Sequence, residues 1–209
     1  MSGKARRGMA RRVRDPRSRD QLVDAAWRLV ARLGPASTTL RAVAAEAGVT
    51  TGSVTHYFED KAELMAAVLR HNGDVATERV VQAVGAKRGL AAAKQATLAL
   101  LPLDDVRFRC WQVWLAFWSQ APGQVREGGF LDGYREWSGK VAAYLAEAVE
   151  DGELPAGLDL RHEINVLGAL VAGTGLLAGS DEAGRAQLRR RARRVFGEHF
   201  EALAARKVS

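Results

Sequence analysis

Residues 40–59 read LRAVAAEAGVTTGSVTHYFE, a pattern of two short amphipathic helices on either side of a glycine. Counted from the start of this stretch, the fifth residue is small (Ala44), the ninth is glycine (Gly48) and the fifteenth is apolar (Val54). A small fifth residue lets two helices cross closely, and a glycine can adopt the positive φ of a tight interhelical turn. The apolar fifteenth residue would pack the second helix on the first. The spacing predicts a helix-turn-helix, against the simpler alternative of two ordinary helices joined by a glycine turn.

The rest of the chain carries apolar residues at helical spacing, which predicts an all-α protein of about nine helices. Before the helix-turn-helix, a helix over about 16–33 should stop at Gly34. After it, Asp60 and Glu63 resemble a capping box that opens a longer helix. Later helices are expected over about 90–101, 104–118, 124–151, 160–177 and 181–206. We therefore expect three parts: a basic arm over 1–16, a helix-turn-helix domain over 17–62 and a larger helical domain over 63–209.

The net charge of +7 is concentrated at the N-terminus. The first 20 residues hold eight bases against two acids, and the bases are Lys4, Arg6, Arg7, Arg11, Arg12, Arg14, Arg17 and Arg19. Blocks of like charge seldom fold, so a disordered solubilising tail is one interpretation. A flexible basic arm beside a DNA-binding module could also follow phosphates or enter the minor groove. Charge alone does not choose between the two.

Several classes of protein are disfavoured by what the sequence lacks. No apolar run approaches the roughly 18 residues of a membrane span, and no apolar segment follows the basic N-terminus as it would in a secretory signal. We therefore expect a cytoplasmic protein with no membrane partner. Cys110, the only cysteine, is expected to be a reduced, partly buried thiol. The histidines show no metal-ligand spacing, and no nucleophile elbow or phosphate-binding glycine loop occurs, so we expect no metal, no cofactor and no catalytic residue.

Several segments carry a family resemblance. Residues 39–49 (TLRAVAAEAGV), 52–58 (GSVTHYF) and 61–64 (KAEL) resemble the DNA-binding region of the TetR family of transcriptional regulators. The resemblance is specific over about 17–70. The THYF sequence differs from the commoner YYHF of that family and is closer to the SHYF of its choline-responsive BetI branch. The WLAFW sequence over 114–118 also resembles that branch, and the resemblance over 90–209 is otherwise loose.

The resemblance implies a repressor that binds a palindromic operator as a homodimer and releases it when a small-molecule inducer binds the larger domain. The N-terminal residues of a recognition helix lie on base edges in the major groove, where Ser and Thr suit bases and phosphates alike. Lys61, in the first turn of the next helix, could hold a phosphate, whereas Tyr57 could instead belong to the core. We expect DNA contacts from Thr39, Thr50, Thr51, Gly52, Ser53, Thr55, His56, Tyr57 and Lys61.

Four of the five tryptophans lie in two adjacent predicted helices of the larger domain. Such a cluster either fills a helical core or lines a ligand cavity between helices. For a cavity, we expect ligand contacts from Trp111, Trp114, Trp118, Tyr134 and Trp137. Their rings could bind a cation. However, the BetI branch carries Asp-Gly-Leu-Trp where this chain has GTGL at 173–176, which implies a roomier, more neutral pocket and favours a mostly apolar inducer.

The last two predicted helices have the character of a dimer interface. The penultimate helix holds small residues that would let another helix approach closely, namely Gly168, Ala169, Ala172, Gly173 and Gly175. Two copies of this helix pair would form a four-helix bundle, which the TetR resemblance also implies. The arginine run over 189–194 is expected to be a solvated face rather than a second DNA site.

Two other classes of function remain open. An enzyme with a basic tail would need a catalytic constellation assembled from distant residues. A non-specific architectural DNA-binding protein would account for the basic arm, but not for the compact helix-turn-helix or the apolar second domain. Sequence-selective DNA binding without turnover would argue against the enzyme, and competition between operator and bulk DNA would test the architectural alternative.

Overall fold

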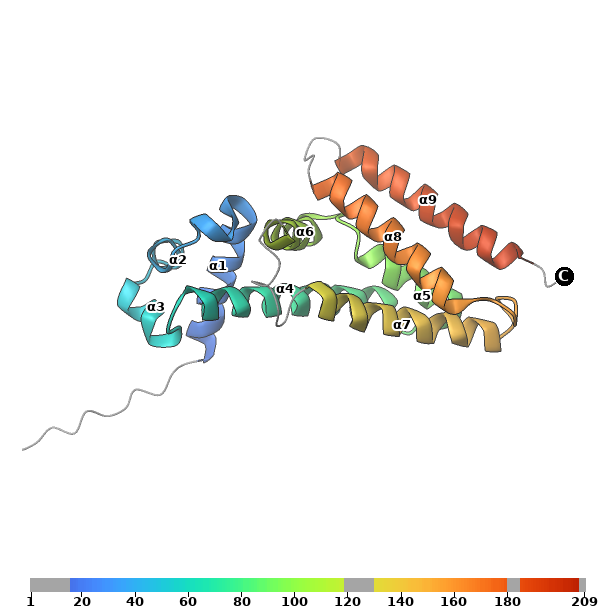
Figure 1. Ribbon diagram of the computed structural model, residues 1–209, viewed down its shortest axis with the longest axis horizontal. Coiled ribbons are helices and arrows are strands. Elements are labelled where there is room, and N and C mark those ends of the chain that lie inside the picture. Colours follow the sequence, from blue (N-terminus) through green and yellow to red (C-terminus); the bar gives the residue numbers. More distant parts are fainter. Residues whose placement is uncertain (1–15, 119–129, 180–184, 207–209) are drawn as a thin grey trace, which may run out of the picture.

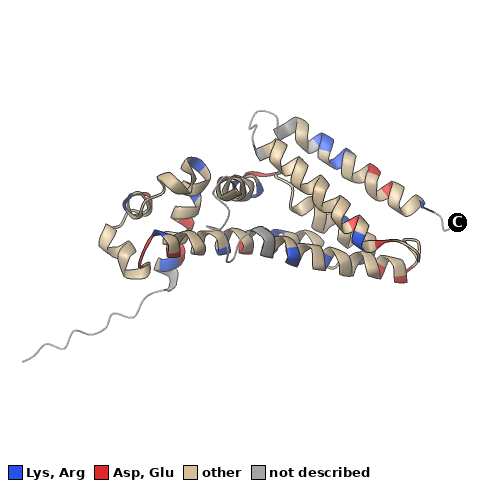
Figure 2. Cartoon of the chain, in the orientation of Figure 1, with Lys and Arg blue, Asp and Glu red and all other residues tan. Residues whose placement is uncertain are grey.

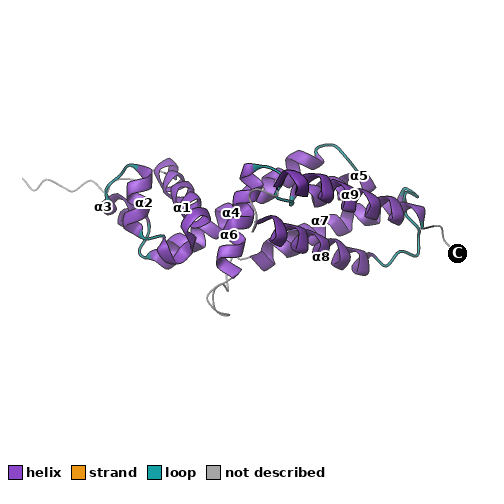
Figure 3. Ribbon diagram, turned by 90° about the horizontal axis from the view of Figure 1, so that it is seen from above, coloured by secondary structure: helices purple, strands orange, loops and turns teal. Residues whose placement is uncertain are grey.

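The computed structural model describes residues 16–118, 130–179 and 185–206, and within these ranges the chain forms helices and no strands (Figure 3). The helices are α1 (Pro16–Ser37), α2 (Leu40–Ala47), α3 (Thr51–Tyr57), α4 (Lys61–Val84), α5 (Gly89–Ala99), α6 (Asp105–Trp118), α7 (Phe130–Glu150), α8 (Leu160–Gly179) and α9 (Arg185–Ala205). The predictions of an all-α fold and of about nine helices are confirmed for the described part of the chain. The predicted basic arm over 1–16 falls almost wholly outside it.

The first three helices pack into a small unit at one end of the molecule (Figure 1). α1 is interrupted at Gly34, where the sequence predicts a stop. The φ of 74° at this residue lies outside the helical range, and it is a conformation that glycine adopts readily but that strains other residues. Val30 of α1, Val43 of α2 and Val54 of α3 are all 0% exposed. Each helix therefore contributes a fully buried side chain to one shared core.

α4 connects this unit to the rest of the molecule (Figure 1). At its start, the backbone N–H of Glu63 donates to Asp60 Oδ1 at 2.8 Å, and Glu63 Oε2 accepts from the backbone N–H of Glu59 at 2.8 Å. The predicted capping box is thus present in an altered form, because Glu63 returns to Glu59 rather than to Asp60. Beyond the cap, α4 contacts α1, α5, α6 and α7 along its length.

The remaining helices form the larger unit. α5 packs against α7, α8 packs against α6 and α7, and α9 packs against α8 and α5. Leu145 of α7, Leu167 of α8 and Phe196 of α9 are 0% exposed at the centre of this packing. The apolar side of α9 is therefore buried in part, but Val195 on the same helix is 42% exposed.

Charged residues distribute unevenly over the last two helices (Figure 2). Arg190, Arg193 and Arg194 of α9 are exposed, as the sequence predicts for a solvated face. α8 carries charged residues only near its start, at Arg161 and Glu163. Among the described helices, none combines the length and the apolar character that crossing a membrane would require.

Candidate nucleic-acid interface and ligand cavity

The turn between α2 and α3 has the geometry that the 40–59 stretch predicts. Gly48 ends α2 in the left-handed region, at φ 69° and ψ 30°. The backbone N–H of Val49 then donates to Ala44 O at 2.9 Å, which closes the helix end. Ala44 is 3% exposed and Val54 is 0% exposed. The three residues that define the spacing therefore act as predicted, and the helix-turn-helix is confirmed.

α3 presents its first turn and its polar residues to solvent. Thr50 caps the helix, because its Oγ1 accepts from the backbone N–H of Ser53 at 3.2 Å and lies 3.0 Å from Ser53 Oγ. The exposed predicted contacts are Thr50, Thr51, Gly52, Thr55 and His56, and the half-buried ones are Ser53 and Tyr57. The structure therefore brings seven of the nine predicted DNA contacts onto one short helix and its cap.

The other two predicted contacts lie on neighbouring helix starts. Thr39 is exposed and caps α2, where its Oγ1 accepts from the backbone N–H of Ala42 at 3.1 Å. Lys61 Nζ donates to Ala36 O at 2.8 Å, which joins the start of α4 to the segment before α2. A lysine ammonium has three donors, so this bond still leaves Lys61 able to meet a phosphate.

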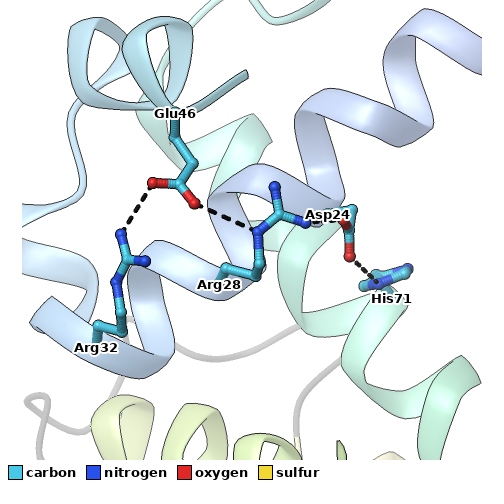
Figure 4. Close-up of polar contacts among 5 residues, drawn as sticks. All are labelled: Asp24, Arg28, Arg32, Glu46 and His71. Atoms are coloured by element: carbon cyan, nitrogen blue, oxygen red, sulfur yellow. Dashed lines mark hydrogen bonds and ion pairs between the residues drawn. The ribbon is translucent and has the colours of Figure 1, made fainter. Parts of the chain in front are cut away.

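An ion-pair network fixes α2 on α1 and reaches α4 (Figure 4). Glu46 of α2 accepts from Arg32 Nη2 at 2.9 Å and from Arg28 Nε at 3.3 Å. The hydrogen bond from Arg32, followed by that from Arg28, holds the pKa of the Glu46 carboxyl below its ordinary value. Arg28 also pairs with Asp24, whose other oxygen lies 3.9 Å from His71 Nε2 on α4. The network thus extends from Glu46 of α2 through Arg28 and Asp24 of α1 to His71 of α4.

A buried polar connection links α1, α4 and α6. Trp27 Nε1 donates to Asn72 Oδ1 at 2.6 Å, and Asn72 Nδ2 donates to Cys110 O at 3.2 Å. Asn72 is 0% exposed and Trp27 is 4% exposed. Helical periodicity does not predict this connection, although a single amide among the buried residues of α4 is a possible signal for it. It joins the small unit to the helix that carries Trp111 and Trp114.

A cavity of about 300 Å³ lies between helices of the larger unit. It is lined from α4 by Gly73, Ala76, Thr77 and Val80, from the segment after α5 by Leu100, from α6 by Trp111 and Trp114, from α7 by Gly133, Tyr134, Glu136, Trp137 and Lys140, and from α8 by Gly168, Ala169, Val171 and Ala172. Four of the five predicted aromatic residues are among them. Trp118 is not, and its side chain lies 46% exposed at the end of α6.

Two glycines of α8 face aromatic rings of the same chain. A Cβ added at Gly175 would lie 2.1 Å from Trp111, and one added at Gly168 would lie 2.5 Å from the Tyr134 hydroxyl. The prediction that these two glycines admit a helix of another subunit is therefore wrong, because rings from α6 and α7 occupy the space. The prediction of a roomier pocket at 173–176 is also wrong at Gly175, because the Trp111 ring fills that position.

Cys110 is 2% exposed, so the thiol is buried more completely than the partly buried thiol that the sequence predicts. Burial, aided by the negative charge of Asp104, raises the pKa of the thiol to about 12.

Because the unfolded thiol has a pKa of about 8.5, stability that Cys110 contributes below that value should be lost as the pH rises toward about 12. We expect urea denaturation to show a larger loss between about pH 8.5 and 10.5 for the wild type than for Cys110→Ala. Equal losses would contradict burial of this thiol.

Metal-ligating side chains are scattered. Within the described ranges, no three His, Cys, Asp or Glu side chains gather closely enough to hold a metal ion.

Comparison with known families covers both units. The family described as "Bacterial regulatory proteins, tetR family" matches residues 22–68, and the one described as "BetI-type transcriptional repressor, C-terminal" matches residues 90–205. The second match is more extensive than the loose resemblance of residues 90–209 in the sequence.

Individual curated regulators are similar to part of the chain. The HTH-type transcriptional regulator BetI of Burkholderia ambifaria is 38% identical over 110 residues, which are 49% of this chain and 54% of that protein. The match thus spans about half the length of the curated relatives.

Solved structures are similar over a larger share of the chain. A Saccharomonospora viridis protein in complex with choline has a TM-score of 0.76 at 23% identity, over 88% of this chain and 97% of that one. SmeT, the repressor of the Stenotrophomonas maltophilia multidrug efflux pump SmeDEF, has a TM-score of 0.67 at 22% identity, over 88% of this chain and 89% of that one. At these identities the likeness concerns the fold. Together with the family matches, it leads to one conclusion: this chain belongs to the TetR family of bacterial regulatory proteins, with a C-terminal domain of the BetI type.

Proposed function

We propose that this chain is a transcriptional repressor that binds a pseudo-palindromic operator as a homodimer and releases it when a small organic molecule enters the cavity. The observation that carries the proposal is the course of α4. The helix begins at Lys61, directly after α3, and lines the cavity with Ala76, Thr77 and Val80 further along. One rigid element therefore meets both the DNA-reading unit and the ligand. The proposal places the protein in the cytoplasm, with its operator.

The buried connection supplies a second route between the two sites. Asn72 joins Trp27 of α1 to the backbone of Cys110 on α6, and the next residue of α6, Trp111, lines the cavity. A ligand that displaces α6 would therefore act on α1 as well as on α4. The inducer must bind better to the conformation whose two recognition helices are wrongly spaced, because a ligand with equal affinity for both shifts nothing.

DNA reading is assigned to α3. Its exposed Thr51 and its half-buried Ser53 lie in the first turn, the part of a recognition helix that meets base edges. We expect Thr51→Ala or Ser53→Ala to reduce the preference for the operator over random DNA by about 1–3 kcal/mol each. Fluorescence anisotropy with the two DNAs measures this, and Ser138→Ala on α7 is the control. An unchanged ratio of affinities in both variants would remove these residues from base reading.

The dimer is assigned to α8 and α9. Leu176, Leu177 and Val195 are exposed on these helices, at 50%, 69% and 42%. A groove between the two helices is lined by Leu177, Leu188 and Val195 among others. Exposed aliphatic side chains gathered on one helix pair are typical of a subunit interface, and a two-fold dimer would match a palindromic site.

Placing a charge in this interface should separate the subunits. We expect Leu177→Glu to shift the protein from dimer to monomer at micromolar concentration and to weaken operator binding at least about tenfold, because an unpaired carboxylate would be buried between subunits. Val81→Glu is the control, since Val81 of α4 is similarly exposed, at 57%. Analytical ultracentrifugation gives the oligomeric state. A Leu177→Glu protein that stays dimeric would exclude this face.

Selection of bound DNA from a random pool tests the proposal as a whole. A recovered two-fold symmetric site, bound far more tightly than bulk DNA, is the expected result. Failure to enrich any site, with bulk DNA competing equally, would favour the architectural alternative. Turnover of a substrate without site-selective DNA binding would favour an enzyme.

A further inference from the structure

The charged groups of the cavity neutralise each other. Among the described residues that line it, the charged side chains are Glu136 and Lys140, one helical turn apart on α7. Lys140 Nζ lies 2.6 Å from Glu136 Oε1. The two side chains are 53% and 35% exposed, Glu136 being the more exposed, so the pair lies toward solvent rather than in the interior. Among the described lining residues, no carboxylate is therefore left unpaired for a ligand.

The tryptophans of the lining offer little open ring surface. Trp111, Trp137 and Trp114 are only 1%, 5% and 9% exposed. Trp111 and Trp114 meet edge to face at 5.5 Å, so each covers part of the other. A cation–π site needs the cation over an accessible ring face, within about 6 Å of its centre. These rings are instead covered by protein.

The indole N–H groups of Trp111 and Trp137 also donate to acceptors inside the protein. Trp111 Nε1 donates to Leu100 O at 2.6 Å, and Trp137 Nε1 donates to Ala96 O at 3.2 Å. With these donors used, the cavity is lined mainly by hydrocarbon from aromatic, alanine and valine side chains. Thr77, Tyr134 and the Glu136–Lys140 pair supply the polar side-chain groups among its described lining residues.

We propose that the cavity binds an uncharged, predominantly apolar molecule whose polar end meets the Glu136–Lys140 pair, and that it discriminates against quaternary ammonium cations. The inference rests on the proposed function, since it names the class of inducer for the same cavity. Apolar surface gains free energy on entering such a lining, in proportion to its area. A cation entering here would find the described carboxylate of the lining paired with Lys140 and the tryptophan faces covered, so it would recover little of its lost hydration. The volume of about 300 Å³ fits a small ligand.

A matched pair of probes isolates the effect of charge. Benzyltrimethylammonium and neopentylbenzene have nearly the same shape, and only the first is charged. We expect the neutral probe to bind at least about tenfold more tightly, measured by calorimetry and by tryptophan fluorescence. Equal or tighter binding of the ammonium probe, or no binding of the neutral one, would overturn the proposal.

Two substitutions locate the binding and identify its cause. Ala172→Leu, which fills space in the lining, should weaken neopentylbenzene at least about tenfold, whereas Ala91→Leu on the exposed face of α5 should not. Lys140→Met leaves Glu136 unpaired and should shift the ratio of affinities toward the ammonium probe by about three- to tenfold. Adding Glu136→Gln should reverse that shift. A ratio that Lys140→Met leaves unchanged would contradict the role of the pair.

The outcomes separate the ligand class from the function. If the same preparation binds a selected operator but prefers the ammonium probe, the repressor proposal stands and the ligand class is wrong. If it enriches no DNA site, the proposed function fails whatever the probes do.

Discussion

Gly175→Ala should lower the free energy of unfolding by about 1–3 kcal/mol, although alanine favours helices more than glycine does. The added Cβ would lie 2.1 Å from two atoms of the Trp111 ring, which is itself only 1% exposed and bonded to Leu100. The ring cannot move away without disturbing the packing of α6 or entering the cavity. Equilibrium denaturation in urea measures the loss, and the ligand probes should bind more weakly in the same variant.

The control lies on α7, outside the proposed dimer face. Gly139 is exposed and a Cβ there would meet nothing within 4 Å, so Gly139→Ala should raise the free energy of unfolding by about 0.5–1 kcal/mol. Replacing Trp111 by Phe should relieve part of the strain, so the double variant Gly175→Ala/Trp111→Phe should lose less than the sum of its single changes. Similar stabilisation by both alanines would show that Trp111 does not pack on Gly175.

Asn72→Leu should cost about 1–3 kcal/mol, because it keeps the side-chain volume but leaves the buried Trp27 indole N–H without its acceptor. It also removes the bond to Cys110 O that joins α4 to α6. If this connection carries the signal, ligand should release operator less completely from Asn72→Leu than from the wild type. Denaturation in urea and operator release are the two measurements.

A double-variant cycle separates the hydrogen bond from general loss of packing. Trp27→Phe removes the indole N–H, so Asn72→Leu should cost less in that background, by about 0.5–3 kcal/mol. The exposed Asn165 of α8 provides the control, since Asn165→Leu should change stability by no more than about 0.5 kcal/mol. Additive costs of the two changes would mean that the bond contributes nothing beyond packing.

Local features made the helix-turn-helix predictable. The close crossing at Ala44, the left-handed turn at Gly48 and the buried Val54 all lie within fifteen positions of one another. Helix starts and stops are equally local, because Thr50, Asp60 and Gly34 act on backbone groups a few residues away. The family resemblance added the function and the expectation of a cavity, but it gave no reason to separate Trp118 from the tryptophans that line it.

The sequence alone thus determined the helices, their ends and the DNA-reading motif, all of which depend on neighbours along the chain. Only the tertiary structure decided that Gly175, unlike Gly173, is covered by a ring, and that Asn72 bonds to partners 45 and 38 residues away. The physical reason is that helical periodicity gives the direction of a side chain relative to its own helix axis. Which distant element meets that side chain depends on how the helices pack.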